Sequence, residues 1–417
     1  YTNTEPVLLN QLYFRLFPNA PGFGGQMTVT GVTVNGRVAP STLLAQKTTL
    51  EVPLPRALAP GEGVDLALTY RLRVPPTARS GYGMFAYEGG ILTLAGFYPT
   101  IPVFDRQGWH IEDTPPHGDA IYTDVALYDV TLTLPAGMAV VTSGDVLTAT
   151  THPDGTQAVH AFSGPMRDFF IAAAADYQRT GQTVDGVTVT AYFPAGHNSA
   201  GEFVLQTAAG ALDVYGRAFG PYPYRALDVV AAPMPATLGG VEYPGVVVLA
   251  RRYYDSPDDL TEFVAAHEVA HQWWYGLVGN DPVNAPWLDE ALTQYTAVYY
   301  FEQTYGPQRR AELVNRYFWT PYNQLRRSGA DRAVAGPVYT FSEAAYGAVV
   351  YGKGPLFFEA VRDELGDARY LAALRAYAGD HRYGLAAPDD LLDVFRQAGG
   401  ENTINSLYEQ WIGGLRD

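Results

Sequence analysis

The hydrophobic periodicity of this chain changes once, near residue 195, and no other feature constrains its fold as strongly. Before that point, short segments alternate apolar and polar residues and end at clusters of Gly, Pro and Asn, which is typical of antiparallel strands. The clearest of these segments are 27–34, 48–54, 64–74, 122–134 and 182–193. Because no helix-period stretch separates them, we predict an antiparallel β domain over residues 1–195.

The second part of the chain, residues 196–417, has the longer repeat of amphipathic helices. The predicted helical segments are 199–219, 257–278, 286–305, 306–327, 347–365, 367–379 and 387–398. Two short apolar runs, 228–232 and 245–250, are predicted to be strands on either side of a loop. The predicted fold class is therefore α+β, with the β domain first and a mainly α-helical domain after it.

Composition excludes several classes of protein and partner. The chain has 43 acidic and 27 basic residues, and its net charge of -16 argues against nucleic acid as a partner, because phosphate binding needs a positive surface. The absence of cysteine excludes disulfides, thiolate zinc sites and cysteine nucleophiles. The longest apolar runs, such as 169–175 and 246–250, are far shorter than the roughly 18 residues of a membrane span. We therefore expect neither nucleic acid nor a membrane span.

The sequence HEVAH at 267–271 lies within a predicted helix and is the strongest chemical signal in the chain. His267 and His271 are one helical turn apart on the same face, so their imidazole nitrogens can converge on one zinc ion. Glu268 projects to the side of that face, where it can accept a proton from water at the metal. The competing interpretation is two unrelated histidines on a helix.

A catalytic zinc ion needs a third protein ligand and one open position. The sequence WLDEAL at 287–292 begins the next predicted helix and supplies two carboxylates, Asp289 and Glu290. Either one can reach a metal held by the first helix. Asp289 has a second interpretation, as an acidic residue favoured at the start of a helix by the helix dipole. The spacing of the residues leaves both ligands open.

The HEVAHQWW sequence at 267–274, followed by WLDE at 287–290, resembles the gluzincin metallopeptidases of the aminopeptidase N family. The resemblance extends to GGVEYP at 239–244, which is similar to the exopeptidase motif of the family, although Val241 stands where Met is usual. It also extends to YGKG at 351–354, which is similar to the tyrosine motif of the family. These motifs occur in the family's order, and the resemblance implies a thermolysin-like catalytic domain after the N-terminal β domain.

The resemblance assigns His267, His271 and Glu290 as the ligands of one zinc ion per chain. Zinc polarises a carbonyl group and lowers the pKa of bound water to about 7. Glu268 is then implied as the general base that takes the proton of that water and carries it to the leaving amine. Tyr351 is implied to stabilise the oxyanion together with the metal.

The exopeptidase motif decides which peptides are expected as substrates. Glu242 is implied to pair with the free α-amino group of a peptide, and Gly239 and Gly240 let the backbone approach the substrate like an added strand. The predicted function is therefore a zinc-dependent aminopeptidase acting on peptides with a free N-terminus. Two alternatives stay open: a zinc endopeptidase with the same metal site, and a catalytically silent binding protein of the gluzincin fold.

Two features differ from the larger family members. The segment 90–99, GILTLAGFYP, has no acidic or amide residue to make the second contact with the amine that the family's β domain supplies, and Glu88 is the nearest acid. The resemblance ends near Trp411, so we expect a short form that lacks the C-terminal helical domain and has a more open cleft. Because the chain begins at Tyr1 without Met, we expect a processed or trimmed product. An exported or cell-envelope bacterial protein is favoured, with a cytoplasmic location as the alternative.

Several conspicuous residues receive structural interpretations. Trp273, Trp274 and Tyr275 are predicted to pack in the core around the zinc helix, and Arg251-Arg252 to be a solvated pair after a strand. The remaining histidines are predicted to lie on the surface or in loops: His110, His117, His152, His160, His197 and His381.

The chain contains only two lysines, Lys47 and Lys353, and uses arginine at every other basic position. Lys353 lies within the tyrosine motif, two residues after Tyr351. Because the ammonium group of lysine is compact and the guanidinium of arginine is a planar fork, the two are not interchangeable at a packed site. We therefore predict a specific structural requirement for lysine at position 353.

Overall fold

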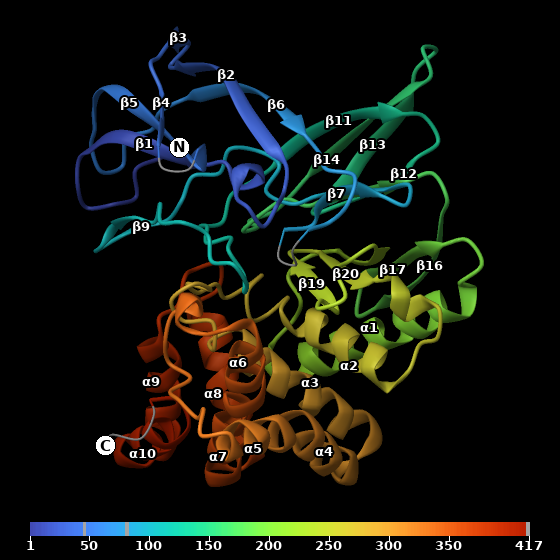
Figure 1. The fold of residues 1–417 in the computed structure, drawn as a ribbon, viewed down its shortest axis with the longest axis vertical. Helices are drawn as coiled ribbons and strands as arrows, with labels where there is room; N and C mark the ends of the chain where they lie inside the picture. The colour runs from blue at the N-terminus through green and yellow to red at the C-terminus, as the bar shows by residue number, and fades with distance from the viewer. Residues whose placement is uncertain (45–46, 80–82, 414–417) are drawn as a thin grey trace.

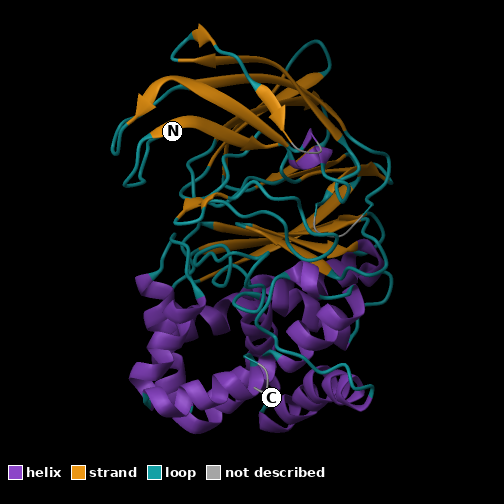
Figure 2. Ribbon diagram, turned by 60° about the vertical axis from the view of Figure 1, so that its left-hand side comes forward, coloured by secondary structure: helices purple, strands orange, loops and turns teal. Residues whose placement is uncertain are grey.

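The structure, a computed structural model, describes residues 1–44, 47–79 and 83–413. It has an N-terminal β-sheet domain followed by a mainly helical domain, which confirms the predicted fold class (Figure 1). The strands form the upper part of the molecule and the helices the lower part in Figure 2. The search for a helix long and apolar enough to cross a membrane, made over the described residues, finds none.

The β domain consists of small antiparallel sheets. Its strands are β1 (Leu9–Arg15), β2 (Gln26–Val34), β3 (Arg37–Val38), β4 (Thr42–Leu44), β5 (Thr49–Leu58), β6 (Leu66–Arg73), β7 (Phe85–Glu88), β8 (Ile91–Leu94), β9 (Phe104–Asp105), β10 (Gly108–Trp109), β11 (Asp129–Pro135), β12 (Ala139–Thr142), β13 (Asp145–Thr151), β14 (Thr156–Phe162) and β15 (Ile171–Ala174). They pair in the orders β1-β5-β4, β3-β2-β6, β12-β15-β8-β7, β11-β14-β13 and β10-β9.

Two of the predicted strands are wrong in detail. The segment predicted over 122–134 is extended only from Asp129, where β11 begins. The segment predicted over 182–193 is a hairpin, with β16 (Tyr177–Val184) and β17 (Val187–Pro194) on either side of a two-residue turn. Asp185 and Gly186 both have positive φ, 47° and 83°, and this Asp-Gly pair reverses the chain.

A mixed five-stranded sheet lies between the β domain and the helices. It joins β16 and β17 to β18 (Ala226–Ala232), β20 (Val246–Ala250) and β19 (Gly240–Tyr243), in the order β16-β17-β18-β20-β19. β17, β18 and β20 are parallel, and β19 is antiparallel to β20 at the edge. The predicted domain boundary near residue 195 lies between β17 and the helix that follows. That boundary stays a prediction. Because β16 and β17 pair in one sheet with β18, β20 and β19, the strand pairing favours a boundary before β16.

The second domain supplies the helices, which lie below this sheet (Figure 1). They are α1 (Asn198–Phe219), α2 (Asp259–Ala270), α3 (Glu290–Tyr305), α4 (Pro307–Leu313), α5 (Thr320–Arg327), α6 (Glu343–Ala348), α7 (Pro355–Leu365), α8 (Asp367–Asp380), α9 (Pro388–Gly399) and α10 (Glu401–Trp411). Short 3-10 helices are η1 (Phe17–Asn19), η3 (Arg251–Tyr254) and η5 (Val338–Thr340), and π-helical turns are η4 (Val314–Trp319) and η6 (Val349–Lys353).

The helices differ from the predicted ones at their ends. α2 ends at Ala270 instead of continuing to residue 278, because the chain turns sharply through the following residues, where the amide of Gly276 bonds the carbonyl of His271 at 2.8 Å. The predicted helices over 306–327 and 347–365 are each interrupted by one of the π-helical turns. Such turns insert an extra residue into a helix and are frequent at functional sites.

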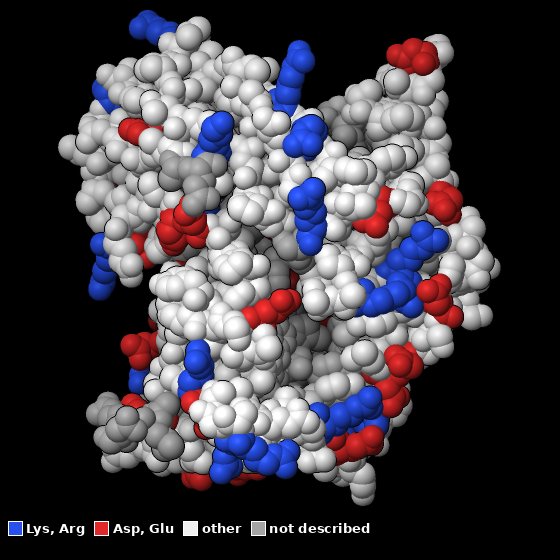
Figure 3. Space-filling view, in the orientation of Figure 1, with Lys and Arg blue, Asp and Glu red and all other residues white. Residues whose placement is uncertain are grey.

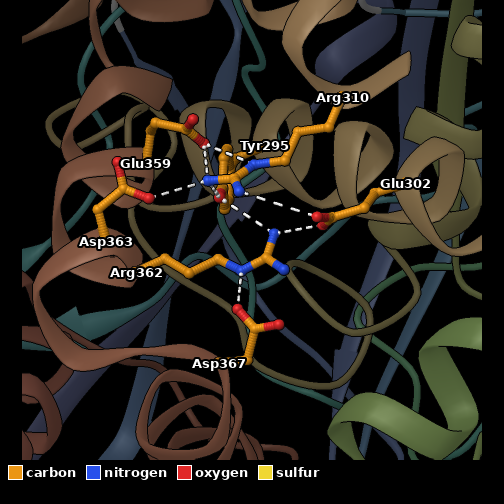
Figure 4. A network of polar contacts seen from close by, with 7 residues as sticks. All are labelled: Tyr295, Glu302, Arg310, Glu359, Arg362, Asp363 and Asp367. Atoms are coloured by element: carbon orange, nitrogen blue, oxygen red, sulfur yellow. Dashed lines mark hydrogen bonds and ion pairs between the residues drawn. The ribbon is translucent and has the colours of Figure 1, made fainter. Parts of the chain in front are cut away.

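A partly buried network of charges joins α3 and α4 to α7 and α8 (Figure 4). Arg362, which is 2% exposed, lies 2.6 Å from the carboxylate of Glu302 and 2.8 Å from that of Asp367. Arg310 lies 2.9 Å from the carboxylate of Glu359. Each arginine is paired with acids from two other elements, so the network holds α3, whose first residue is Glu290, against the helices behind it.

Candidate metal centre and peptide-binding cleft

Helix α2 carries two of the predicted site residues, and its C-cap residue is a third. Its first turn is capped by Asp258, whose side chain accepts hydrogen bonds from the amides of Leu260 and Thr261 at 3.1 Å. Further along, the helix turns His267, Glu268 and His271 into the protein, where they are 7%, 5% and 1% exposed. His271 follows the last helical residue, and its backbone conformation is still helical, so the predicted one-turn spacing is kept.

The two histidines and Glu290 bring three ligand atoms together. Nε2 of His267 and Nε2 of His271 are 3.2 Å apart, and Oε2 of Glu290 lies 3.3 Å and 3.5 Å from them. Ligands of tetrahedral zinc, at about 2.0–2.1 Å from the ion, are separated by about 3.3–3.4 Å. The donor set and its spacing therefore fit a zinc ion. In the part of the chain that the structure describes, the other group close enough to hold a metal, Glu242, Glu268 and His271, shares one of these histidines.

The tautomer of His271 suits metal binding. Its Nδ1 lies 3.0 Å from the carbonyl oxygen of Trp274, so this nitrogen carries the hydrogen and donates it. The lone pair of Nε2 then faces His267 and Glu290. A hydrogen bond of this kind orients the ring and raises the basicity of the ligand nitrogen.

The structure separates the two carboxylates that the sequence left as alternatives. Asp289 caps α3, and its side chain accepts a hydrogen bond from the amide of Glu290 at 2.7 Å. Glu290 is the residue whose carboxylate meets the two histidines. Asp289 therefore acts as the helix cap that starts α3 at the point where Glu290 faces the site.

The exopeptidase-like segment forms edge strand β19, directly against α2. A Cβ atom added to Gly240 would collide with the carboxylate of Glu268, and one added to Gly239 would lie 2.9 Å from the hydroxyl of Tyr253. A side chain at position 240 would therefore displace Glu268, and one at position 239 would crowd Tyr253 and Val264. Glu242, on the same strand, is 7% exposed, and its carboxylate lies within 4.8 Å of ligand atoms of Glu268 and His271.

Tyr351 lies in the π-helical turn η6 and faces the same site. Its ring centroid is 6.1 Å from that of His267. The turn is anchored by Lys353, which is 3% exposed and whose Nζ donates to Oδ1 of Asp331 at 2.9 Å and to the carbonyl of Arg332 at 2.8 Å. The hydroxyl of Tyr322 donates to the other carboxylate oxygen of Asp331 at 3.0 Å. The buried ammonium group thus ties the turn to the loop that precedes α6.

One cavity of about 550 Å³ collects every predicted site residue. The predicted residues that line it are Gly239, Gly240, Glu242, His267, Glu268, His271, Glu290 and Tyr351. Figure 3 shows the surface hollowed where the β domain meets the helical domain. A cavity of this size accommodates a few amino-acid residues.

Burial changes the acidity of the carboxylates in this cavity. It raises the pKa of Glu268 well above its ordinary value, and the negative charge of Glu242 raises it further. Burial also raises the pKa of Glu242. Each carboxylate is therefore a stronger base than a solvated glutamate. A positive group that approaches either one would stabilise its ionised form.

Two residues that lie in or beside the cavity were not found from the sequence. His117 lies in a loop, as predicted, and it also lines the cavity, where its ring packs edge-on against Tyr346 at 5.3 Å. Burial, together with the nearby carboxylates of Glu242 and Glu290, raises the pKa of Asp119 well above its ordinary value. Both residues belong to the loop between β10 and β11, and nothing in its sequence indicates which side chains turn inward.

Tyr317, from the π-helical turn η4, also lines the cavity and packs on Phe263 at a ring distance of 4.3 Å. Glu88, the nearest acid in the segment compared with the family, has a different role. Its carboxylate accepts a hydrogen bond from the amide of Ala78 at 2.9 Å, and it is not among the residues that line the cavity.

The structural interpretations of other conspicuous residues are partly confirmed. Trp273 and Trp274 are each 1% exposed and pack in the core around α2. Arg252 is more than a solvated cation, because its guanidinium donates to the carbonyls of Pro235 and Leu238 and so holds the loop before β19.

Comparisons with known proteins agree with this geometry. A model of the peptidase family M1 domain matches residues 203–411. Aminopeptidase M1-B of Oryza sativa subsp. japonica is 26% identical over 307 residues, which are 69% of this chain and 34% of the relative. Aminopeptidase N of Lactobacillus delbrueckii subsp. lactis is 25% identical over 440 residues, which are 98% of this chain and 47% of the relative. The chain thus spans less than half of the length of these curated relatives.

Solved structures share the fold across the whole chain. An M1 zinc metallopeptidase from Deinococcus radiodurans matches 98% of this chain and 87% of its own length, with a TM-score of 0.73 and 21% identity. A mutant of that protein bound to a Tyr-Ser-Ala substrate matches with a TM-score of 0.72 and 21% identity, over 98% of this chain and 88% of its own. Since the family model covers half of the chain and all the motifs of the site, this protein belongs to peptidase family M1.

Proposed function

We propose that this protein is a zinc-dependent aminopeptidase that hydrolyses the N-terminal peptide bond of peptides with a free N-terminus. The observation that carries the proposal is the convergence of His267, His271 and Glu290 at distances that suit tetrahedral zinc, beside the buried carboxylates of Glu242 and Glu268. Membership of peptidase family M1 supports the proposal, as do the names of the relatives, which are aminopeptidases.

Glu268 has the central role in the proposed reaction. His267, His271 and Glu290 would hold a zinc ion, which would acidify bound water and polarise the scissile carbonyl. Glu268 accepts a proton from the attacking water and then gives it to the leaving amine nitrogen. Its raised pKa, caused first by burial, suits a group that must take up a proton and hold it at neutral pH.

Other residues orient the substrate and stabilise the charge that develops. Glu242 pairs with the α-ammonium group and so places the first peptide bond beside Glu268. The free edge of β19, at Gly239 and Gly240, hydrogen-bonds the peptide backbone as an added strand would. Tyr351 donates its hydroxyl hydrogen to the former carbonyl oxygen as that oxygen gains negative charge.

The two alternative functions differ from this one at defined points. A zinc endopeptidase would use the same metal ligands and Glu268, but it would accept peptides that extend past the first residue. The placement of a buried carboxylate, Glu242, where the chain would have to continue argues against it, since that carboxylate has to be paired with a positive group. A silent binding protein would have no need for Glu268 and Tyr351 beside the metal ligands.

The test compares the tripeptide Tyr-Ser-Ala with its N-acetylated form, each with zinc-loaded protein and with protein treated with a chelator. We expect release of free tyrosine from the unblocked peptide, no cleavage of the acetylated one, loss of activity on chelation, and recovery when about one zinc per chain is restored. Cleavage of the acetylated peptide at a comparable rate would favour the endopeptidase. Zinc binding without cleavage of either peptide would favour the silent protein.

Replacement of Lys353 by arginine is expected to lower kcat by about 10- to 100-fold, the size of effect that a displacement of about 1 Å at a catalytic group produces. The ammonium group is buried and bonds Asp331 and Arg332 as a compact donor, a geometry that the larger planar fork of arginine does not reproduce. Displacement of Lys353 moves the turn that carries Tyr351. The measurement is kcat on Tyr-Ser-Ala, with the melting temperature followed in parallel.

The matched control is Lys47→Arg, which replaces an exposed lysine of the β domain by the same residue. It is expected to change kcat and the melting temperature very little. Equally mild effects of both substitutions would contradict a structural requirement at position 353 and would leave codon usage as the explanation of the lysine count.

A further inference from the structure

The segment that follows α2 connects the metal centre to the rest of the protein. The carbonyl of Trp274 accepts the hydrogen bond that orients the ring of His271. The side chain of Gln272 donates to the carbonyl of Tyr243 at 3.0 Å and accepts from the amide of Gly245 at 2.9 Å, directly after Glu242 in β19. A shift of this segment would therefore move both a metal ligand and the strand that holds Glu242.

The β domain holds this segment through one buried arginine. Arg167 lies between β14 and β15, is 2% exposed, and donates to the carbonyl of Tyr275 through Nε at 2.7 Å and to that of Leu277 through Nη2 at 3.5 Å. It also donates to the carbonyls of Thr123, at 3.2 Å, and Gly384. These four acceptors are backbone carbonyls from three separate parts of the chain, so the planar guanidinium fixes their relative positions.

Asp168, the next residue, holds the other end of Tyr275. The hydroxyl of Tyr275 donates to Oδ2 of Asp168 at 2.6 Å, and Asp168 is 3% exposed. Tyr275 itself has a φ of 145°, a backbone conformation that residues with a side chain rarely adopt. Such a conformation persists only where the surroundings determine it, and here the carbonyl and the hydroxyl of the same residue are both held from the β domain.

The space around this contact is filled. A Cβ atom added to Gly279 would collide with the guanidinium of Arg167, so the strand-like segment after Leu277 lies directly against it. The carbonyl that Arg167 holds belongs to Tyr275, one residue after the carbonyl that orients His271. The route from the β domain to the metal ligand therefore consists of two adjacent peptide units.

We propose that Arg167 and Asp168 are positioning residues of the metal centre, which hold Tyr275 so that the carbonyl of Trp274 stays aligned with Nδ1 of His271. The inference rests on the zinc centre of the proposed function. It gives the β domain a role in metal affinity that is separate from any contact with the peptide. Partners of this kind, outside the ligands themselves, commonly change metal affinity by 10- to 100-fold.

The test uses Tyr275→Phe, which removes one hydroxyl and keeps the ring. Zinc affinity is measured by competition with a chelator, and the melting temperature of the metal-free protein is measured in parallel. The matched control is Tyr224→Phe, because the hydroxyl of Tyr224 donates at 2.7 Å to the carbonyl of Pro165, two residues before Arg167. We expect Tyr275→Phe to weaken zinc binding by about tenfold and Tyr224→Phe to leave it within about twofold, with similar changes in melting temperature.

A second pair of variants tests the acceptor. Asp168→Asn keeps an oxygen that can accept from Tyr275, whereas Asp168→Ala removes it, so zinc affinity should fall less for asparagine than for alanine. Equal zinc affinities for Tyr275→Phe and Tyr224→Phe, or for the two Asp168 variants, would overturn the proposal and leave the contact as a purely structural one. Because zinc affinity is measured without a substrate, failure of the wild-type protein to cleave peptides would count against the proposed function and not against this inference.

Discussion

Replacement of Glu268 by glutamine is expected to lower kcat by about 10²- to 10⁴-fold while zinc stays bound, the range by which a positioned general acid or base accelerates a reaction. Glutamine keeps the size of the side chain but accepts no proton at neutral pH. His267, His271 and Glu290 are unchanged by the substitution, so the metal centre keeps its ligands. The measurement is kcat on Tyr-Ser-Ala together with the zinc content of the purified variant.

The matched control is Glu262→Gln, an isosteric substitution at another buried position of α2. The carboxylate of Glu262 accepts hydrogen bonds from the hydroxyls of Tyr300 and Tyr305, at 3.1 Å and 2.7 Å, and is not among the residues that line the cavity. Its replacement is expected to change kcat by no more than a few fold. Wild-type turnover in Glu268→Gln would refute the general-base role, and a parallel loss of zinc would show that the substitution disturbs the metal centre instead.

Replacement of Glu242 by glutamine is expected to lower kcat/KM for unblocked peptides by about 10²- to 10³-fold, because loss of one partner of a desolvated charge pair costs roughly 2–5 kcal/mol. The carboxylate of Glu242 is buried beside Glu268 and His271. In the variant, the peptide ammonium group would therefore lose its charged partner in a site shielded from solvent. The effect should be confined to peptides with a free amine. N-acetylated Tyr-Ser-Ala should not be cleaved by either the variant or the wild type.

Glu88→Gln serves as the control for this prediction, since Glu88 is the competing acid of the β domain. Its carboxylate bonds the amide of Ala78 and lies outside the cavity lining, so kcat/KM should change very little. A larger loss in Glu88→Gln than in Glu242→Gln would transfer the amine-binding role to the β domain. Equal kcat/KM values for the free and the acetylated peptide in wild-type protein would favour the endopeptidase.

Much of the metal centre could be predicted because its information is local. The one-turn spacing of His267 and His271 follows from the helix repeat, and Asp258 marks the first turn of that helix. Glu290 could be chosen over Asp289 only by resemblance to a family. The structure then gave the physical reason, since Asp289 uses its carboxylate to cap α3.

The end of α2 and the inward-facing side chains of the loop between β10 and β11 could not be predicted in the same way. Helical periodicity continues past Ala270, yet the chain turns there, where the indole of Trp274 donates to Thr296 and the carbonyl of Tyr275 accepts from Arg167. Arg167 is 108 residues from Tyr275, and no pattern around either residue indicates the other. His117 likewise lies in a Pro- and Gly-rich loop, where composition indicates a turn but not which side chain faces the cavity.

The sequence by itself determined the two kinds of domain and the helix that carries the two histidines, because helix and strand preferences arise from residues a few positions apart. Only the tertiary structure decided how close β19 lies to α2, which carboxylate meets the histidines, and how Arg167 holds the segment behind His271. These contacts join residues that are distant along the chain. Their geometry depends on the packing of whole sheets and helices, which local preferences do not specify.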